Sequence, residues 1–433
     1  MVVPSKMFLN KLADLRLRRN ILVRWQEADS FTLIELLIVI AIIGILAAAV
    51  VLVLNPQQMI AQGRDSTRLQ DIKTLNSAIG EYLANGNTAL GTANVVYVSV
   101  PDPTLASGAT STCASLGLPA LPSGWIYNCV STTTLQETNG SGWMPVNFHS
   151  ISTGTPLPTL PIDPTNTTSS GEFYTYATNG TSYELTAHFE SNNYQTYAAS
   201  DGGPDPSAYE AGTSLTLTPF IHGMVAYWPL AEGTGLTAYD HSGWGNNGTL
   251  SATTDTPVWT ANCFNAKTCL TFDGLDDYVN FGTPANFDNL NATFIAWINT
   301  TYTFSDMRII VNQATSTHNF LMIMNSGNIV AATVQGSTTQ WEQTQNTYND
   351  GKWHMVAAVR NGDNAGNLQI YVDGQAVALT TNTGNSWSMS DTAKMGAKSS
   401  SQFFYGGEIS KSYVFNTALT AAQIQAIYNA EKP

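Results

Sequence analysis

The sequence contains few charged side chains, and few of these are basic. Only 11% of the 433 residues are charged, with 17 Lys and Arg against 31 Asp and Glu, and this is less than half the usual share. Such a composition excludes a protein that binds nucleic acid over its whole surface, because phosphate contacts need Lys and Arg. Polarity comes instead from Ser, Thr, Asn and Gly, alongside 10 Trp and 18 Tyr. This composition is typical of an extracellular β protein rather than a cytosolic enzyme.

The sequence also lacks the common catalytic motifs. Its 6 histidines include no His-Glu-x-x-His pair, so a zinc site is not expected. There is no Gly-x-Ser-x-Gly motif, no phosphate-binding P-loop and no strand of the form Glu-x-Asp-x-Glu. We therefore expect no enzyme activity and no catalytic residues. A pair of carboxylates on separate strands stays open as an alternative.

A basic leader precedes a long apolar run. Residues 1–30 carry six bases and three acids, a net charge of +3 against −14 for the whole chain. Residues 36–54 hold no charged side chain, and as a helix they would span about 28 Å, the thickness of the hydrocarbon core. The basic flank predicts a cytoplasmic leader. We expect a single-pass helix in the inner membrane, and the alternative is a buried core helix.

Glu35 stands at the start of this run, where an unpaired carboxylate is costly. It belongs to the segment SFTLIELL, residues 30–37, which resembles the prepilin signature of type IV pilins and type II secretion pseudopilins. The resemblance implies that a prepilin peptidase cuts between Ser30 and Phe31 and that the Phe31 amine is methylated. It also implies that Glu35 neutralises the amine of a neighbouring subunit during assembly, since buried opposite charges are tolerable as a pair. Ser30 stands where the family usually has Gly.

The apolar run continues into an amphipathic segment. Within residues 59–83, apolar side chains recur every three or four positions, which predicts a helix. Its expected apolar face consists of Leu69, Ile72, Leu75, Ile79 and Leu83. Arg68 is expected on another face of this helix.

The segment from residue 91 to 205 is rich in turn residues and holds short alternating runs. Strands are expected at 95–98, 173–176 and 183–189. The proline-rich loop and the Tyr-rich hairpin of this segment resemble the C-terminal half of major pseudopilin heads. In that family the last loop can bind calcium. With Asp201 and Asp205 as the candidate ligands here, we expect a solvated turn instead.

From residue 223 onward the chain consists of repeated strand–turn units. Hairpins are expected at 320–334 and at 368–379. The second contains Asp373-Gly374, and the dipeptide Asp-Gly favours a type I′ turn, whose twist matches that of the strands. About a dozen such runs predict a two-sheet sandwich or jelly roll.

Several short motifs between residue 223 and the end of the chain resemble those of the laminin-G-like, concanavalin A-type jelly rolls of bacterial surface proteins. They are AYWPL at 226–230, DHSG at 240–243, FDG at 272–274, WH at 353–354 and YVDG at 371–374. The resemblance implies a lectin-like fold. Trp244 lies among Gly and Asn, and Trp341 lies in a Gln/Thr-rich stretch. These two tryptophans are therefore the expected candidates for stacking on sugars.

Members of this family often hold calcium near the start and end of the domain. Asp240 and Glu408 lie at positions that can supply oxygen ligands. The family's usual acidic pair after the final Gly-x-Ile is replaced by Ser410 and Lys411, and a lysine opposes a divalent cation. Two roles are therefore expected for Asp240 and Glu408. They either bind calcium, or they accept hydrogen bonds within turns. No other cofactor is expected.

The four cysteines occur as two local pairs, Cys113 with Cys129 and Cys263 with Cys269. Their even number, their local spacing and an exported chain favour two disulfides over a metal site. The alternative is four buried thiols.

These observations predict an α+β protein, in which a long N-terminal pilin helix and a small β head precede an all-β jelly roll. The expected parts are a leader (1–30), a membrane and assembly helix (31–84), a head (85–210), a linker (211–222) and a laminin-G-like domain (223–433).

We expect a type IV pilin-like filament subunit, minor or at the tip, that displays a lectin-like domain for adhesion or glycan binding. Its expected partners are other pilin subunits, prepilin peptidase, the inner membrane before assembly, and a carbohydrate or surface protein, but no nucleic acid. The mature chain is expected in an extracellular pilus or pseudopilus at the cell surface. The alternatives are a type II secretion pseudopilin that engages exported cargo and a surface-anchored glycosidase.

Overall fold

The computed structural model describes most of the chain. The described residues are 32–54, 56–169, 171–218, 223–251, 256–287, 289–312, 319–335, 338–362, 367–383, 392–398 and 403–432. The chain divides into two compact units, residues 1–59 and 60–433.

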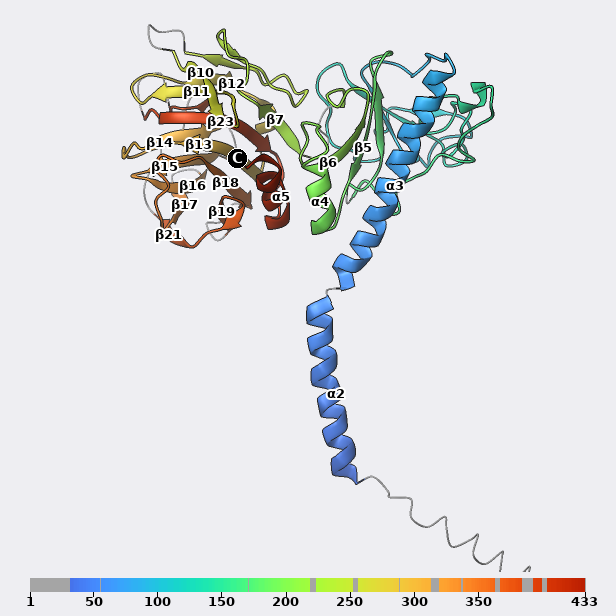
Figure 1. Ribbon diagram of the computed structural model, residues 1–433, viewed down its shortest axis with the longest axis horizontal. Coiled ribbons are helices and arrows are strands. Elements are labelled where there is room, and N and C mark those ends of the chain that lie inside the picture. Colours follow the sequence, from blue (N-terminus) through green and yellow to red (C-terminus); the bar gives the residue numbers. More distant parts are fainter. Residues whose placement is uncertain are drawn as a thin grey trace, which may run out of the picture. The chain divides into compact units, whose positions relative to one another are not determined.

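The first unit contains helix α2 (Leu33–Leu54), drawn in blue in Figure 1. The apolar side chains of its first turns are exposed, namely Leu33, Ile34, Leu36, Leu37, Ile38, Val39, Ile40, Ile42 and Ile43. The side chains of residues 44–54 are outside the described part of the chain. Among the helices as far as they are described, none is both long enough and apolar enough to cross a membrane.

The amphipathic helix predicted at 59–83 is confirmed as α3 (Pro56–Ala84). Its buried apolar stripe packs into the core of the head and consists of Ile72, Leu75, Ala78, Ile79 and Tyr82. Leu69 and Leu83, at the ends of the predicted face, are half-buried.

Arg68, which was expected on another face than the apolar stripe, is fully buried, and its guanidinium pairs with carboxylates. Its Nε lies 2.6 Å from Asp163 Oδ2, and its Nη1 lies 2.7 Å from Asp65 Oδ1 and 2.5 Å from Glu190 Oε1. Glu190 also pairs with Arg64. These partners replace the water that the buried guanidinium loses, so Arg68 fastens α3 to the loop that carries Asp163.

The sheet of the head has six strands, in the order β2 (Thr110–Ser111), β3 (Ile126–Val130), β1 (Val95–Val98), β4 (Thr175–Thr178), β5 (Tyr183–His188) and β6 (Ala208–Gly212). β1 is parallel to β3, and the other pairs are antiparallel. The strands predicted at 95–98 and 183–189 are confirmed. The strand predicted at 173–176 begins later, at Thr175, and Tyr174 just before it exchanges hydrogen bonds with Ser99.

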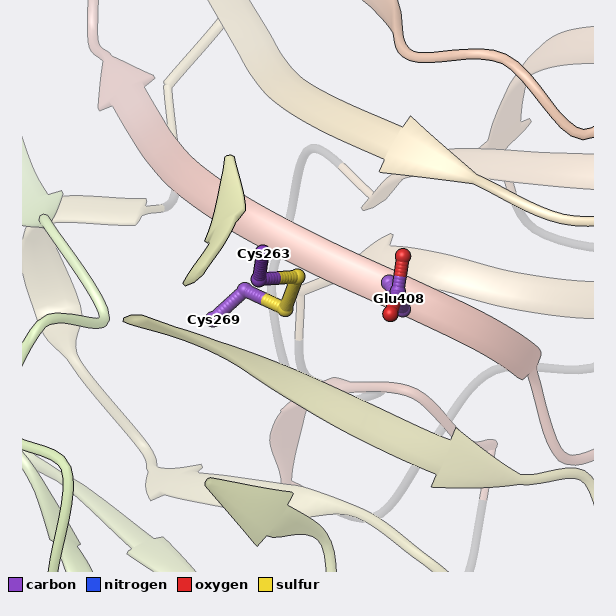
Figure 2. A group of neighbouring side chains, drawn as sticks. All are labelled: Cys263, Cys269 and Glu408. Atoms are coloured by element: carbon purple, nitrogen blue, oxygen red, sulfur yellow. A yellow bond between two sulfur atoms is a disulfide. The ribbon is translucent and has the colours of Figure 1, made fainter. Parts of the chain in front are cut away.

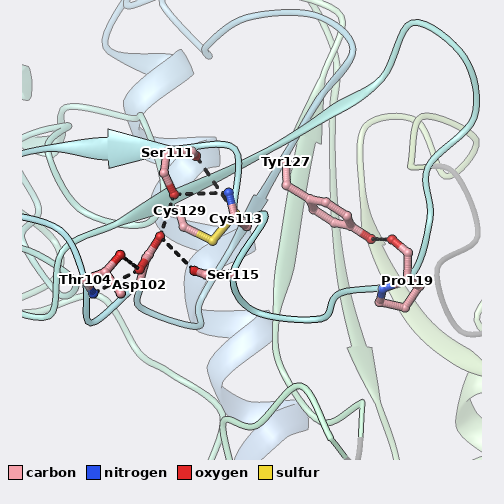
Figure 3. Close-up of a disulfide and its surroundings, with 8 residues drawn as sticks. All are labelled: Asp102, Thr104, Ser111, Cys113, Ser115, Pro119, Tyr127 and Cys129. Atoms are coloured by element: carbon pink, nitrogen blue, oxygen red, sulfur yellow. Dashed lines mark hydrogen bonds between the residues drawn. A yellow bond between two sulfur atoms is a disulfide. The ribbon is translucent and has the colours of Figure 1, made fainter.

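A disulfide stabilises the loop that follows β2. It joins Cys113 to Cys129 on β3, as predicted (Figure 3). Beside it, the buried Asp102 carboxylate accepts hydrogen bonds from the Ser111 hydroxyl (2.8 Å) and the Thr104 amide (3.0 Å). The loop is therefore held by a covalent bond and by an internal polar centre. A short helix, α4 (Asn192–Ala198), and a 3-10 turn, η1 (Phe148–Ser150), complete the head.

The C-terminal part is a sandwich of two antiparallel sheets (Figure 1). One sheet has the order β10 (Val258–Phe264), β11 (Lys267–Asp273), β23 (Gly406–Phe415), β13 (Asn291–Asn299), β18 (His354–Asn361), β19 (Leu368–Val372) and β20 (Gln375–Ala376), and β7 (Met224–Trp228) also pairs with β23. The other has the order β21 (Leu379–Thr383), β17 (Thr338–Thr344), β16 (Asn328–Gln335), β15 (Asn319–Asn325), β14 (Met307–Val311), β22 (Ala393–Met395), β12 (Val279–Gly282), β9 (Gly248–Leu250) and β8 (Thr237–Ala238). Apolar side chains of both sheets form one core, to which Trp228, Phe294 and Met322 contribute. The predicted α+β fold class, with an all-β jelly roll, is confirmed.

Both predicted hairpins form. β15 and β16 pair around Ser326-Gly327, with Asn325 opposite Asn328. In the second hairpin Asp373 and Gly374 have φ values of 51° and 77°, as a type I′ turn requires. A 3-10 turn, η2 (Ala285–Phe287), precedes β13.

Helix α5 (Ala421–Glu431) covers the outer face of the sheet that contains β23. The Glu431 carboxylate near its end accepts hydrogen bonds from Trp297 Nε1 and Lys411 Nζ, both at 2.7 Å, and from the Tyr413 hydroxyl. Lys411, which stands in place of an expected acid, thus binds the end of α5.

Candidate functional site

The N-terminal motif surrounds the start of α2. Ser30 and Phe31, the predicted cleavage and methylation positions, are outside the described residues. Oε2 of Glu35 accepts hydrogen bonds from the Thr32 amide and the Thr32 hydroxyl, each at 2.8 Å. The Glu35 amide donates to the same hydroxyl oxygen at 3.3 Å. This capping box satisfies free amides of the helix terminus, and it holds the carboxylate on Thr32, the second residue of the predicted mature chain.

Four acidic side chains of the head converge at its last two strands. Glu184 lies on β5, Glu210 lies on β6, and Asp201 and Asp205 lie in the loop between them. Asp201 Oδ2 accepts a hydrogen bond from the Glu210 amide (2.5 Å), and Glu210 Oε2 accepts one from the Asp205 amide (2.9 Å). Gly203 permits this approach, because a Cβ atom there would overlap the Glu210 carboxylate. These four acids are called the acidic cluster below.

Burial and mutual repulsion disfavour the charged forms of the acidic cluster. Glu184, Asp205 and Glu210 are 0%, 2% and 3% exposed. Burial, together with the charges of neighbouring acids, raises the pKa of Asp201 to about 7 and that of Asp205 to about 6. Burial and the adjacent Glu184 charge raise the pKa of Glu210 well above its usual value. Within the described part of the chain, no Lys or Arg forms an ion pair with these acids.

The expectation of a solvated turn at Asp201 and Asp205 is wrong, because the fold buries Asp205 and brings both acids against Glu210. The cluster supplies the all-oxygen ligand set that calcium prefers. The Glu184 carboxylate hydrogen-bonds with the Glu210 carboxyl, and its Oε2 accepts hydrogen bonds from the amides of Leu217 (2.6 Å) and Thr218 (2.7 Å). The four residues therefore fit a calcium ion, which their carboxylates would hold.

In the sandwich, Asp240 accepts hydrogen bonds within a turn. Its Oδ1 accepts from the amides of Tyr227 (3.0 Å) and Ser242 (2.8 Å). Its Oδ2 accepts from the Ser242 hydroxyl (2.8 Å) and the Asn246 amide (2.9 Å). Each carboxylate oxygen thus has two donors, and the side chain connects the turn to β7.

Glu408 lies on β23, which pairs with β11. The predicted disulfide between Cys263 and Cys269 joins β10 to β11 and lies beside Glu408 (Figure 2). Possible ligand atoms of these three residues lie within 4.8 Å of one another. Sulfurs in a disulfide are not thiolates, however, and the thiolate is the form that binds metals. Glu408 Oε2 accepts a hydrogen bond from Asn299 Nδ2 at 3.1 Å.

The structure does not bring Asp240 and Glu408 together. Asp240 binds the amide of Tyr227, and Tyr227 pairs with Tyr413 on β23. Tyr413 is five residues from Glu408, or roughly 16 Å along an extended strand. The two acids therefore do not share a calcium ion.

The expected exposure of Trp341 is wrong, since this side chain is only 8% exposed. It lies opposite Ala332 on β16 and packs with Leu321 and Val330 on one face of the sheet. β17 lies between β16 and β21, so side chains of the neighbouring strands cover Trp341. Its polar neighbours in the sequence had wrongly indicated an exposed position. Trp244 is half-buried and packs against the core between the sheets.

Partly exposed aromatic, apolar and acidic side chains gather instead where two loops of the sandwich meet. Leu275, after β11, and Phe304, before β14, are 72% and 50% exposed. The Tyr302 and Phe304 rings lie 5.3 Å apart, and the Tyr302 hydroxyl donates to the Asp273 carbonyl oxygen at 3.3 Å. Carboxylate oxygens of Asp273 and Asp276 lie within 4.8 Å of each other. These five residues are called the rim cluster below. Sequence analysis noted Asp273 only within the FDG motif and did not identify the cluster, although aromatic residues in a Thr-rich loop were an available signal.

Comparisons with known proteins assign both ends of the chain. Residues 29–51 match the prokaryotic N-terminal methylation motif, and residues 272–425 match the concanavalin A-like lectin/glucanases superfamily. No curated protein matches the chain.

Three solved structures illustrate what the chain is similar to. Domain 4 of AbnA, an extracellular arabinanase of Geobacillus stearothermophilus in complex with arabinotriose, is 13% identical, covering 48% of this chain and 98% of that one, with a TM-score of 0.37. Botulinum neurotoxin type C, whose cell entry depends on two ganglioside molecules, is 16% identical, covering 49% and 52%, with a TM-score of 0.36. Trypanosoma rangeli sialidase is 12% identical, covering 47% and 32%, with a TM-score of 0.32. By its family matches, the chain carries a prepilin-type N-terminal methylation motif and a domain of the concanavalin A-like lectin/glucanases superfamily.

Proposed function

We propose that the chain is a subunit of a type IV pilin-like filament that displays its lectin-like domain for glycan binding. The observation that carries this proposal is the joining of a prepilin motif and a lectin-like sandwich in one chain. The exposed apolar side chains of the first turns of α2 support it. Such a surface is unfavourable in water and is covered when copies of the helix pack together.

Under this proposal the chain first enters the inner membrane as a single-pass protein. Prepilin peptidase cuts between Ser30 and Phe31, and the Phe31 amine is methylated. Glu35 then pairs with the amine of a neighbouring subunit in the growing filament. The head occupies residues 85–210 and the linker residues 211–222. A lectin-like domain on every subunit would crowd the filament, so a minor or tip position is proposed.

Replacing Glu35 with Ala tests the assembly step. The substitution removes a charge beside an apolar helix, so membrane insertion should be retained while filament yield falls. Thr32→Ala is the matched control, since it removes the hydroxyl that donates to Glu35 within the same subunit but leaves the carboxylate. Normal filaments from the Glu35→Ala variant would contradict the proposed pairing.

The rim cluster supports glycan binding by the sandwich. Sugars bind proteins by packing their C–H faces on aromatic rings and by donating hydroxyl hydrogens to carboxylates. The half-exposed Phe304 ring offers the first contact, and the Asp273 and Asp276 carboxylates offer the second. The low share of charged residues, 11%, further suits a neutral ligand.

A glycan array of the full mature chain, with and without calcium, tests this function. Phe304→Ala should weaken the bound signal about tenfold, equivalent to about 1.4 kcal/mol. Tyr239→Ala is the control, because Tyr239 is 54% exposed and lies outside the rim cluster. An array without signal, or an equal loss in both variants, would contradict glycan binding at the rim cluster. Release of free sugars would identify the glycosidase alternative.

A pseudopilin that engages exported cargo is the second candidate. The acidic cluster favours it, because this cluster lies in the last loop of the head, where the resemblance to major pseudopilins implies calcium. Shearing cells and measuring the share of this chain in the external filaments distinguishes the two. Recovery in filaments supports the pilus, and retention in the envelope with a bound secreted protein supports the pseudopilus.

A further inference from the structure

Residues 345–353, between β17 and β18, hold the loop that carries the aromatic rings of the rim cluster, and they are called the supporting segment below. Asn349 Nδ2 donates to the Tyr302 carbonyl oxygen, and the Gly351 amide donates to the Thr300 carbonyl oxygen, each at 3.1 Å. The contact is close, because a Cβ atom at Gly351 would come within 3.2 Å of the Thr301 side chain. The position of the Tyr302 ring therefore depends on how firmly the supporting segment is held.

A histidine between two carboxylates fixes the end of the supporting segment. His354 Nδ1 lies 2.8 Å from Asp373 Oδ2, in the turn between β19 and β20, and its Nε2 lies 3.1 Å from Asp350 Oδ1. A neutral imidazole has one donor nitrogen and one acceptor nitrogen, whereas the protonated ring has two donors. Both contacts are hydrogen bonds only when His354 is protonated, because the acceptor nitrogen of the neutral ring would face a carboxylate oxygen. These contacts, first that with Asp373, accordingly raise the pKa of His354.

Other titratable groups beside His354 keep their charge while it titrates. The hydrogen bond from the Lys352 ammonium lowers the pKa of Asp350 to about 2, so Asp350 is ionised in the pH range over which histidine titrates. Burial raises the pKa of Tyr348, whose ring lies 5.4 Å from that of His354, and the pKa of Tyr428, which packs from α5 against the turn between β19 and β20. Both phenols are therefore neutral in this range.

We propose that protonated His354, held between Asp350 and Asp373, keeps the rim cluster in position, and that loss of its proton releases this support. As the pH rises, Nδ1 keeps its hydrogen for Asp373, the bond with Asp350 is lost, and Asn349 and Gly351 are held less firmly. His354 is a positioning residue, because it acts on the rim cluster through the supporting segment. The support itself is independent of the ligand, whereas its effect on glycan binding rests on the proposed function.

Hydrogen exchange of the full mature chain in detergent, followed by mass spectrometry, tests the support without a ligand. Protection of the Gly351 amide, relative to an unstructured amide at the same pH, should fall by up to roughly fivefold between about pH 5 and about pH 8, as expected for the loss of a partly exposed ion pair. The Asn416 amide, which donates to the Gly223 carbonyl oxygen at 2.7 Å, is the internal control and should not change. Constant protection of Gly351, or an equal fall at Asn416, would overturn the proposal.

Two substitutions assign the pH dependence to the pair of His354 and Asp350. His354→Gln cannot be protonated but still offers a donor to Asp373, so it should show the lower protection of Gly351 at both pH values. Asp350→Asn removes the charge that faces Nε2 and should also abolish the pH dependence. His241→Gln is the matched control, because His241 is an exposed histidine of the same sandwich. A pH dependence that persists in both His354→Gln and Asp350→Asn would overturn the proposal.

The glycan array, run at the same two pH values, tests the consequence for binding. The wild-type signal should fall by a similar factor as the pH rises, and the signal of His354→Gln should be equal at both. A pH-dependent Gly351 amide with a constant glycan signal would overturn the link between the support and the rim cluster. An array without signal at either pH would contradict glycan binding, and the exchange of Gly351 would still decide whether the support exists.

Discussion

The head and the sandwich both bury charged groups, but they compensate them differently. Among the described residues, no Lys or Arg forms an ion pair with the acidic cluster of the head, whereas the buried Arg308 of the sandwich pairs with Asp306. In the head, Arg68 and Asp65 are fully buried, and the acidic cluster places four carboxylates together. In the sandwich, the main core is built from residues such as Trp228 and Phe294. A buried charge depends on its partner, while apolar burial contributes about 25 cal/mol per Å² without one. The stability of the head should therefore respond to divalent cations more than that of the sandwich.

The largest expected effect comes from removing Arg68. Arg68→Leu leaves Asp65 and Asp163 buried without their guanidinium, which should lower the free energy of unfolding of the head by about 3–5 kcal/mol. Arg64→Leu makes the same change four residues earlier, at a side chain that is 35% exposed and pairs with Glu190. It should cost about 0–1 kcal/mol. Thermal unfolding of both variants measures the difference, and equal losses would contradict the role of buried pairing.

The two disulfides should contribute unequally. Their cysteines are separated by 16 residues in the head and by 6 in the sandwich. Because a longer closed loop restricts the unfolded chain more, replacing Cys113 and Cys129 with Ser should cost about 3 kcal/mol, against about 2 kcal/mol for Cys263 and Cys269. Urea unfolding of the two double variants tests this order. A larger loss in the sandwich would reverse the comparison.

Calcium removal should affect the head alone. At a calcium concentration of about 100 times Kd, the bound ion stabilises the head by about 2.7 kcal/mol, and EDTA should abolish this. The unfolding transition of the sandwich should not move, and Asp240→Asn should leave the calcium response unchanged, because each Asp240 oxygen already has two donors. A calcium-dependent shift of the sandwich in calorimetry would refute this assignment.

The smallest expected effect is a pH dependence in the sandwich. His354 Nδ1 lies 2.8 Å from Asp373 Oδ2, and Nε2 lies 3.1 Å from Asp350 Oδ1. The bond with Asp373, and then that with Asp350, raises the pKa of His354. This stabilisation is fully present below the unfolded-state value of about 6.5 and is lost as pH rises through the folded-state value.

Melting temperatures of the wild type and of His354→Gln between pH 5 and 8 measure this contribution. The difference should be larger at the acidic end and correspond to about 1 kcal/mol or less, since the Asp350 side chain is 44% exposed and exposed pairs contribute little. A difference that grows toward pH 8 would contradict the sign.

The comparison of head and sandwich also shows what the sequence could predict. Hairpins, local cysteine pairs and the N-terminal motif depend on residues close together in the chain, and these predictions agree with the structure or the family matches. Arg68 precedes Ile72 and Leu75 at the spacing of a single helix face, but because of its charge it was assigned to another face. Its partner Asp163, far along the chain, reverses that inference.

The acidic cluster and the position of Trp341 required the assembled sheets. Sequence analysis found Asp201 and Asp205, but Glu184 and Glu210 lie on strands that become neighbours only through pairing of β5 with β6. For Trp341, the alternation of β16 and β17 places it opposite Ala332 and among apolar neighbours. The polar residues next to Trp341 in the sequence do not share these apolar neighbours. The local composition therefore predicted an exposed side chain where the structure has a buried one.

The most direct test of a filament subunit is the N-terminus of the chain recovered from sheared surface filaments. Mass spectrometry should find a chain that begins at Phe31 and carries one added methyl group on its amine. An intact leader beginning at Met1 on chains within those filaments would contradict the account.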